Sequence, residues 1–249
     1  NRIFRVQRRR SILQRMFVYW ALITLGPVLV GLSVSMTSLA VDASLGALQL
    51  GSVADAVLRL LPFLFTCIAR ALLYAILAFY VFCALSLIAL RRVNPPFTSV
   101  QLQRKMEAVL SGKKYEARKS FVPLRQIPLD LQRAVIAAED GSFYEHSGID
   151  WKELNKVWDE ATDGRRLRGG STITQQLVTN LFLTTHSSPI RKALDFSLAP
   201  LAETILSKER ILEIYFNVIE WGPGIYGAEQ ASRYHYKMPV AQLSREQAA

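Results

Sequence analysis

Two long stretches of the chain contain no charged residue and are almost entirely apolar. They run from Phe17 to Val41 and from Ala71 to Leu90. Each is long enough to cross the roughly 30 Å hydrocarbon layer of a bilayer as an α-helix. A signal peptide is the competing interpretation of the first stretch, but its apolar core is too long and no small-residue cleavage site is clear. The pattern therefore predicts a membrane protein with transmembrane helices.

Beyond residue 100 the apolar positions recur at helical spacing. In STITQQLVTNLFL, for example, Ile173, Leu177 and Leu181 fall on one face. Thr172 and Gln175 have the spacing of a capping box and follow a helix-breaking glycine pair, so we expect a helix to begin there. No long run alternates between apolar and polar residues, as a half-buried strand would. We predict a mainly α fold, in which transmembrane helices precede a helical domain.

The two parts are joined by RRVNPPFTSV (91–100), in which the proline pair prevents the second apolar helix from continuing. We accordingly expect a membrane segment at 1–69, a transmembrane anchor at 70–92 and a separate helical domain at 93–249. The chain begins at Asn1 and stops within the helical pattern LSREQAA. We interpret it as a fragment at both ends, with its last domain truncated at the C-terminus.

A net charge of +10 could indicate nucleic-acid binding. From Phe97 onward, however, 20 Lys and Arg are balanced by 18 Asp and Glu, so this part carries only about +2. The rest lies with the membrane segments, including six arginines before the first span. Such arginines mark the cytoplasmic end of a span and favour anionic headgroups. We expect membrane lipids, and no nucleic acid, among the partners.

Candidate chemistry begins where an apolar helix leads directly into the acidic pair Glu139–Asp140, in RAVIAAEDGSFYEHSG (133–148). A carboxylate at the end of an apolar helix is partly desolvated, which raises its pKa toward the range of a useful general base. For such a pair alone, a helix-end ion pair is the alternative. Asp140 and Phe143 are predicted to support the loop. His146 lacks the partners of a metal site and is predicted to be structural.

A second candidate region is GGSTITQQL (169–177). A glycine backbone can approach a ligand closely, and hydroxyl, amide and free N–H groups at a helix N-terminus suit an anionic pyrophosphate. Plain helix capping is the alternative interpretation, and both can hold. The candidate ligands here are Gly170, Ser171, Thr172, Gln175 and Gln176.

Two further stretches complete the pattern, RKALD (191–195) and KERILEIYFN (208–217). Together, the four stretches resemble glycosyltransferase family 51, the peptidoglycan glycosyltransferases that polymerise lipid II. The resemblance covers about residues 71–249 and is strongest to the monofunctional, membrane-anchored members. It implies a lysozyme-like α-helical glycosyltransferase domain in the bacterial inner membrane, with the domain on the periplasmic side. The implied partners are lipid II, the growing glycan chain and candidate cell-wall synthesis or division proteins. No cofactor is required, and Mg²⁺ is left open.

The resemblance also assigns roles to residues. It implies that Glu139 is the catalytic base, which takes a proton from the acceptor sugar, and that Asp195 is a second acid. It implies that Arg191 and Lys192 bind the pyrophosphate leaving group, where charge grows as the bond breaks. An adjacent Arg–Lys pair alone is usually a solvated face. The last stretch is interpreted as structural, through Glu213, Tyr215 and Asn217.

Three positions depart from the family pattern. Asp195 stands where a glutamate is usual, and Thr179 and Ser187 stand where basic residues are common. A shift of about 1 Å matters in a preorganised site, so we expect that restoring the family residues raises turnover. Two alternatives remain open. One is a catalytically impaired membrane scaffold, and the other is a lytic muramidase, which also uses paired carboxylates.

Residues 1–69 resemble a different family, the multi-spanning YihY/BrkB inner-membrane proteins, often mislabelled ribonuclease BN. We find no nuclease chemistry there and expect a fusion or a chimeric gene, joined near Cys67 to Leu72. Both cysteines lie in the second apolar region, and we interpret them as small hydrophobic residues. Two spans would return the chain inward and leave Glu139 in the cytoplasm. We expect the native anchor to be Ala71–Leu90 alone.

Overall fold

The computed structural model describes the backbone of residues 52–162 and 170–248, with side chains at 60–157 and 170–248. The predicted first span, Phe17–Val41, lies outside these residues, as does the YihY/BrkB-like segment up to residue 51. The chain divides into two compact units, which meet between Phe82 and Cys83. The described residues are mostly helical, and the predicted mainly α fold is confirmed.

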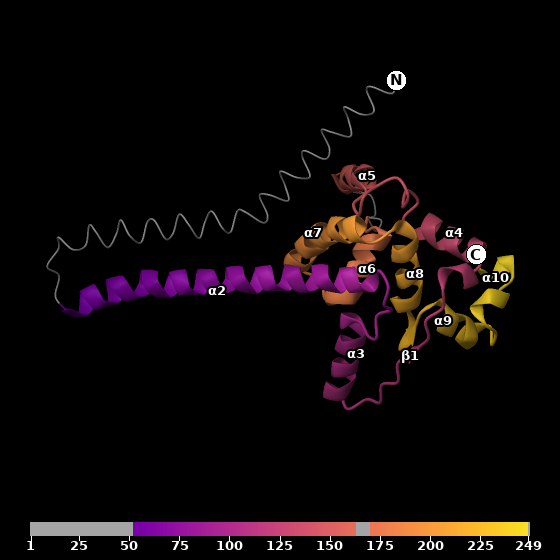
Figure 1. Ribbon diagram of the computed structural model, residues 1–249, viewed down its shortest axis with the longest axis horizontal. Helices are drawn as coiled ribbons and strands as arrows, with labels where there is room; N and C mark the ends of the chain where they lie inside the picture. The colour runs from indigo at the N-terminus through magenta and orange to yellow at the C-terminus, as the bar shows by residue number, and fades with distance from the viewer. Residues whose placement is uncertain (1–51, 163–169, 249) are drawn as a thin grey trace, which may run out of the picture. The chain divides into compact units, whose positions relative to one another are not determined.

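The membrane segment is represented by one helix, α2 (Ser52–Leu90), which Figure 1 draws as an unbroken ribbon. Leu60–Leu90 within it is long and apolar enough to cross a membrane, and it is the one such helix in the described part of the chain. Large apolar side chains such as Phe65 and Leu72 are exposed, as on a lipid-facing helix. The helix passes Arg70 without a break.

The helix ends at Leu90, before the proline pair, as predicted. A capping box then starts α3 (Ser99–Leu110). The hydroxyl of Thr98 accepts a hydrogen bond from the backbone N–H of Gln101, and the side-chain oxygen of Gln101 accepts one from the backbone N–H of Thr98. The cap places the helix start two residues before the predicted helical region. An extended segment, with β1 (Arg118–Lys119) and the short 3-10 turn η1 (Leu124–Gln126), leads to α4 (Leu129–Glu139).

The centre of the second unit is α6 (Ile173–Phe182), which packs against α3, α7 (Pro189–Ile205) and α8 (Lys208–Val218). Figure 1 shows α6 among these helices, and α5 (Trp151–Thr162) precedes it. The predicted capping box at Thr172 is confirmed. Because Ile173, Leu177 and Val178 of α6 are fully buried, this helix is fixed on its apolar face.

A small sheet joins two distant parts of the chain in the order β1-β3-β2. β3 (Ile225–Tyr226) runs parallel to β1 and antiparallel to β2 (Glu220–Gly222). The sequence pattern did not predict it, because strands of two or three residues are too short to show alternation. The rest of the chain forms α9 (Ala228–His235), η2 (Val240–Gln242) and α10 (Arg245–Ala248).

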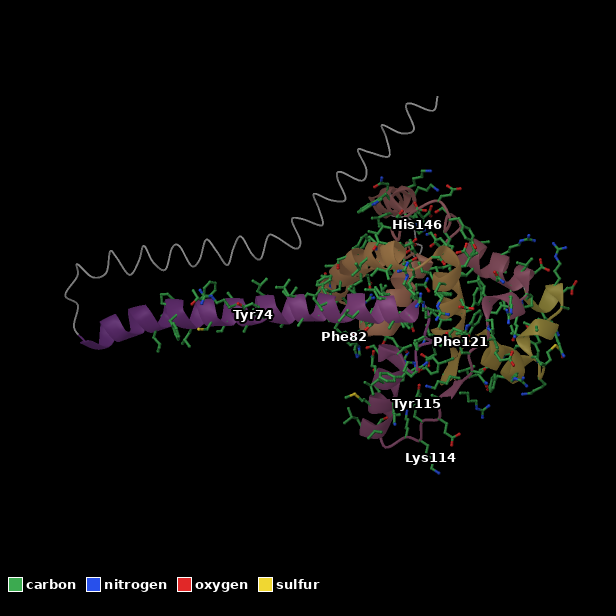
Figure 2. All side chains as sticks on the ribbon, viewed as in Figure 1. Tyr74, Phe82, Lys114, Tyr115, Phe121 and His146 are labelled. Atoms are coloured by element: carbon green, nitrogen blue, oxygen red, sulfur yellow. The ribbon has the colours of Figure 1, made fainter. Side chains whose placement is uncertain are left out.

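Arg210 on α8 connects the end of α2 to the packed helices of the second unit through hydrogen bonds. Its guanidinium donates to the carbonyl oxygens of Leu90 at 2.8 Å and Val93 at 2.9 Å, and to the Asn94 side chain at 2.9 Å. It also lies over the ring of Phe121, labelled in Figure 2, at 5.7 Å from the centroid. The sequence pattern did not single out this arginine, although it lies within the stretch 208–217 that contains Glu213.

Glu213 and Asn217, interpreted above as structural, connect α8 to the segment before α4. The Asn217 amide accepts from the backbone N–H of Val122 at 2.8 Å and donates to the Val122 carbonyl at 2.9 Å. Glu213 accepts from the N–H of Leu124 at 2.9 Å. Gly227 has a φ of 84°, and a Cβ there would lie 2.9 Å from the Asn217 carbonyl oxygen. Only glycine fits this contact without strain.

Candidate active site

The loop after α4 is organised around the carboxylate of Asp140, which is buried. It accepts from Nε2 of His146 at 2.8 Å and from the backbone N–H of Ile173, at the start of α6, at 2.9 Å. The N–H of Gly148 donates to Nδ1 of His146, so the imidazole proton is on Nε2. Phe143 is fully buried below the loop. Asp140 therefore fixes the loop against α6, and His146, labelled in Figure 2, holds the Asp140 carboxylate from within the loop.

The loop closes at Gly148, whose φ is 89°. A Cβ there would lie 2.7 Å from the backbone of Ala199 on α7, so the close approach requires glycine. The Gly148 carbonyl accepts from the hydroxyl of Thr172 at 2.7 Å. The Thr172 hydroxyl also caps α6 by accepting from the N–H of Gln175, and Gln175 returns a bond to the N–H of Thr172. Helix capping is thus what the structure shows for these two side chains.

Glu139 is the last residue of α4 and is exposed. The expectation that this carboxylate is partly desolvated is wrong, because the helix ends at the protein surface instead of below it. Its Oε2 accepts from the side-chain amide of Gln176 at 2.7 Å. The side-chain carbonyl oxygen of Gln176, Oε1, in turn accepts a hydrogen bond from the hydroxyl of Tyr215 at 2.9 Å. A buried tyrosine on α8 therefore orients the amide that holds Glu139.

The Tyr215 hydroxyl remains a hydrogen-bond donor over the whole physiological pH range. Burial raises its pKa well above the usual value, and the negative charges of Glu139 and Asp140 raise it further. Tyr215 is only 3% exposed. The sequence pattern indicated a structural role for it, and helical spacing gave no signal that its hydroxyl reaches Gln176 on α6.

Glu139, Gln176 and Tyr215 line one side of a cleft of about 830 Å³. The remaining walls come from four places: α4, residues 219–221 after α8, helix α9, and residues 243–248 near the C-terminus. These walls are largely apolar. They include Leu131, Ala134, Val135, Ile219, Trp221, Ala228 and Leu243. Glu139 therefore lines a cleft that is large enough to hold a sugar-sized ligand.

A second cluster lies where α6 faces the first turns of α7. The carboxylate of Asp195 is only 2% exposed. One oxygen accepts from Nη1 of Arg191 at 2.9 Å, and the other accepts from the hydroxyl of Thr179 at 2.5 Å. Asp195 is therefore fully engaged, and it holds one edge of the Arg191 guanidinium. Ser187, the third departure from the family pattern, is exposed just before α7.

Lys192 is half-buried beside this cluster. Its ammonium group donates to the hydroxyl of Ser171 at 2.9 Å and lies 5.1 Å from the centroid of the Phe196 ring. Burial lowers its pKa; the carboxylate of Asp195 opposes this effect, and the charge of Arg191 adds to it. Gly170, the first described residue after the gap, lies beside Val157.

One helix thus connects most of the predicted site residues. Gln176 on α6 contacts Glu139, Thr179 on α6 contacts Asp195, and Ser171 just before α6 contacts Lys192. Glu213 and Asn217 belong instead to the framework described above. Among the described residues, no group of three or more His, Cys, Asp or Glu side chains is placed to hold a metal ion.

Comparison with known proteins identifies the family. The transglycosylase family matches residues 105–249, more than half of the chain. The chain belongs to this family. A biosynthetic peptidoglycan transglycosylase of Brucella suis biovar 1 (strain 1330) is 48% identical over 142 residues, which are 57% of this chain and 62% of that protein.

Two other relatives bear the same name. The protein of Laribacter hongkongensis (strain HLHK9) is 40% identical over 157 residues, or 63% of this chain and 69% of that protein. The protein of Pasteurella multocida (strain Pm70) is 40% identical over 179 residues, or 71% of this chain and 73% of that protein. The match thus covers less than two thirds of the length of the Brucella protein and between 62% and 73% of the length of the three transglycosylases.

Proposed function

We propose that this chain is a membrane-anchored peptidoglycan glycosyltransferase that polymerises lipid II into glycan strands. The observation that carries the proposal is the arrangement around α6, which connects an oriented carboxylate, Glu139, to the cations Arg191 and Lys192. Transfer of a sugar from a diphosphate donor needs both a base for the acceptor and positive charge for the leaving group. Family membership and the names of the relatives support the same activity.

In the proposed reaction, the 4-hydroxyl oxygen of the acceptor sugar attacks C1 of the donor sugar. Its proton passes to the carboxylate of Glu139, which Gln176 holds through a hydrogen bond of 2.7 Å. Because Glu139 is exposed, desolvation comes from the bound substrate and not from the protein alone. Attack from the face opposite the diphosphate inverts the configuration at C1.

The bond between C1 and the diphosphate oxygen breaks as the new bond forms, and its electron pair moves to that oxygen. The released group is undecaprenyl pyrophosphate. Lys192 and the guanidinium of Arg191 stabilise the growing negative charge, since fixed cations are already in place when it develops. Asp195 acts through Arg191: it is buried and already paired, and so it orients the guanidinium. No step requires a metal ion, and Mg²⁺ would bind through the substrate diphosphate.

The candidate span at Leu60–Leu90 supports a membrane anchor. We infer that the native enzyme works at the bacterial inner membrane, with its catalytic domain on the periplasmic side, where lipid II and the growing glycan chain meet it. Membrane lipids surround the anchor, and proteins of cell-wall synthesis or division are candidate partners.

The two alternatives make different demands on the site. A lytic muramidase needs a second carboxylic acid that can donate a proton, whereas both oxygens of Asp195 already accept hydrogen bonds from Arg191 and Thr179. A catalytically impaired scaffold would keep these side chains in place but would form no glycan.

The test is to incubate the purified chain with lipid II in detergent and to analyse the products. The proposal predicts polymeric glycan and the release of one undecaprenyl pyrophosphate for each new glycosidic bond. The anomeric configuration of the new linkage is inverted relative to that of the donor. Glu145→Gln, which neutralises an exposed glutamate of the same loop, is the matched control and keeps parental activity. Cleavage of preformed glycan would favour the muramidase, and absence of any product would favour the scaffold.

A further inference from the structure

Thr179 occupies one of the three positions at which the chain departs from the family pattern, yet its hydroxyl is part of the cation cluster. It donates to Oδ1 of Asp195 at 2.5 Å and accepts from Nη1 of Arg191 at 3.4 Å. α6 supplies the threonine, and α7 supplies the other two residues. The contact therefore crosses between the two helices that form this side of the site.

The hydroxyl satisfies an oxygen that would otherwise lack a donor in the described structure. Asp195 is 2% exposed, and Arg191 reaches its other oxygen. Leaving one oxygen of a buried carboxylate without a donor is costly, and it loosens the position of the group. Asp195 and Thr179, both departures from the pattern, fit each other.

The Arg191 guanidinium depends on this pair for its orientation. Nη1 is held by Asp195, while Nε is buried and has no hydrogen-bond partner among the described residues. A planar guanidinium with one fixed edge can turn its remaining donors toward a phosphate only if that edge stays in place. The position of the Asp195 carboxylate is thus set from α6.

We propose that Thr179 is a positioning residue, whose hydroxyl holds Asp195 and thereby orients Arg191 toward the diphosphate of the donor. This inference rests on the proposed function, and it assigns Thr179 a role in leaving-group stabilisation. It replaces the expectation that restoring a basic residue at 179 raises turnover. A lysine there removes the hydroxyl and adds a third cation next to Arg191 and Lys192.

The kinetic test compares Thr179→Val, which keeps the shape and removes the hydroxyl, with Thr179→Ser, which keeps the hydroxyl. Losing a hydrogen bond to a charged group corresponds to a fall of about 10-fold in kcat. KM changes little, because the lost interaction acts mainly as charge grows on the leaving group. Thr179→Ser stays near the parental rate, which a purely shape-based role would not predict.

Thr204→Val is the matched control. Its hydroxyl donates to a carbonyl of its own helix, α7, on the exposed surface, so its removal leaves kcat unchanged. Parental kcat in Thr179→Val, or an equal loss in Thr179→Val and Thr179→Ser, overturns the proposal.

A thermal double-mutant cycle separates this inference from the proposed function. Thr179→Val, Asp195→Asn and the double variant are unfolded by heat, and the inference predicts that the two losses in Tm are not additive. The double variant then loses less than the sum of the single variants. Additive losses overturn the pairing. If the parent polymerises no lipid II, the proposed function fails, and the cycle by itself still decides whether Thr179 holds Asp195.

Discussion

Replacing Tyr215 by phenylalanine removes one hydroxyl group from the hydrogen-bond chain that ends at Glu139. In the parent, this hydroxyl donates to the Gln176 carbonyl oxygen at 2.9 Å, so the amide group of Gln176 must face Glu139. Without that donor, the amide can turn and present its oxygen to the carboxylate. The expected consequence is a base that spends less time in its productive position.

The size of the effect follows from the lost hydrogen bond. A hydrogen bond of this kind contributes about 1 kcal/mol net, and up to about 1.5 kcal/mol. If all of it serves to orient Glu139, kcat falls about 5-fold, and about 10-fold at the upper end. KM changes little, because the Tyr215 hydroxyl binds Gln176 and not the substrate. Thermal stability falls by about 1 kcal/mol, because a buried group loses its partner.

Tyr226→Phe is the matched control. Its hydroxyl is also buried and pairs with the hydroxyl of Tyr115 at 2.6 Å in the small sheet, away from the Glu139 carboxylate. Steady-state polymerisation of lipid II and thermal unfolding are measured for both variants. We expect similar losses of stability but a loss of kcat only for Tyr215→Phe. Equal kcat values for the two variants would refute the positioning of Glu139 through Gln176.

Three further predictions use other parts of the structure. Burial lowers the pKa of Lys192, so its positive charge is lost at a lower pH than that of an ordinary lysine. Lys192→Arg should therefore extend activity toward alkaline pH. An unchanged fall of activity at alkaline pH would contradict this role. Arg210→Ala should destabilise the catalytic unit by about 2–3 kcal/mol in thermal unfolding, against little change for the exposed Arg133→Ala. Alkaline phosphatase fused after Ala249 should be inactive if both predicted spans insert, and active in a chain that starts at Arg70; activity in the longer chain would contradict the two-span topology.

Features with a local cause were predictable from the sequence. The capping box at Thr172 and the end of the long helix before the proline pair depend on neighbouring residues, and both are found. The ties made by Glu213 and Asn217 were predicted from a motif, although their partners in the chain were not.

Contacts between distant segments could not be predicted in the same way. No periodicity indicates that Tyr215 reaches Gln176, or that Thr179 donates to Asp195, because each pair depends on how α6 packs against α7 or α8. Partial desolvation of Glu139 was predicted from the apolar character of α4, but the packing of α4 leaves its last residue exposed. An apolar helix predicts which face is buried, and not how deep its end lies.

The central claim is that Glu139 takes the proton from the acceptor, and one variant tests it most directly. Glu139→Gln keeps the size of the side chain and a carbonyl oxygen for Gln176, but it cannot accept the proton. Its rate of lipid II polymerisation, measured with saturating substrate and with unchanged thermal stability as proof of folding, should fall by on the order of 10²–10⁴. Polymerisation by Glu139→Gln at the parental rate would contradict the account.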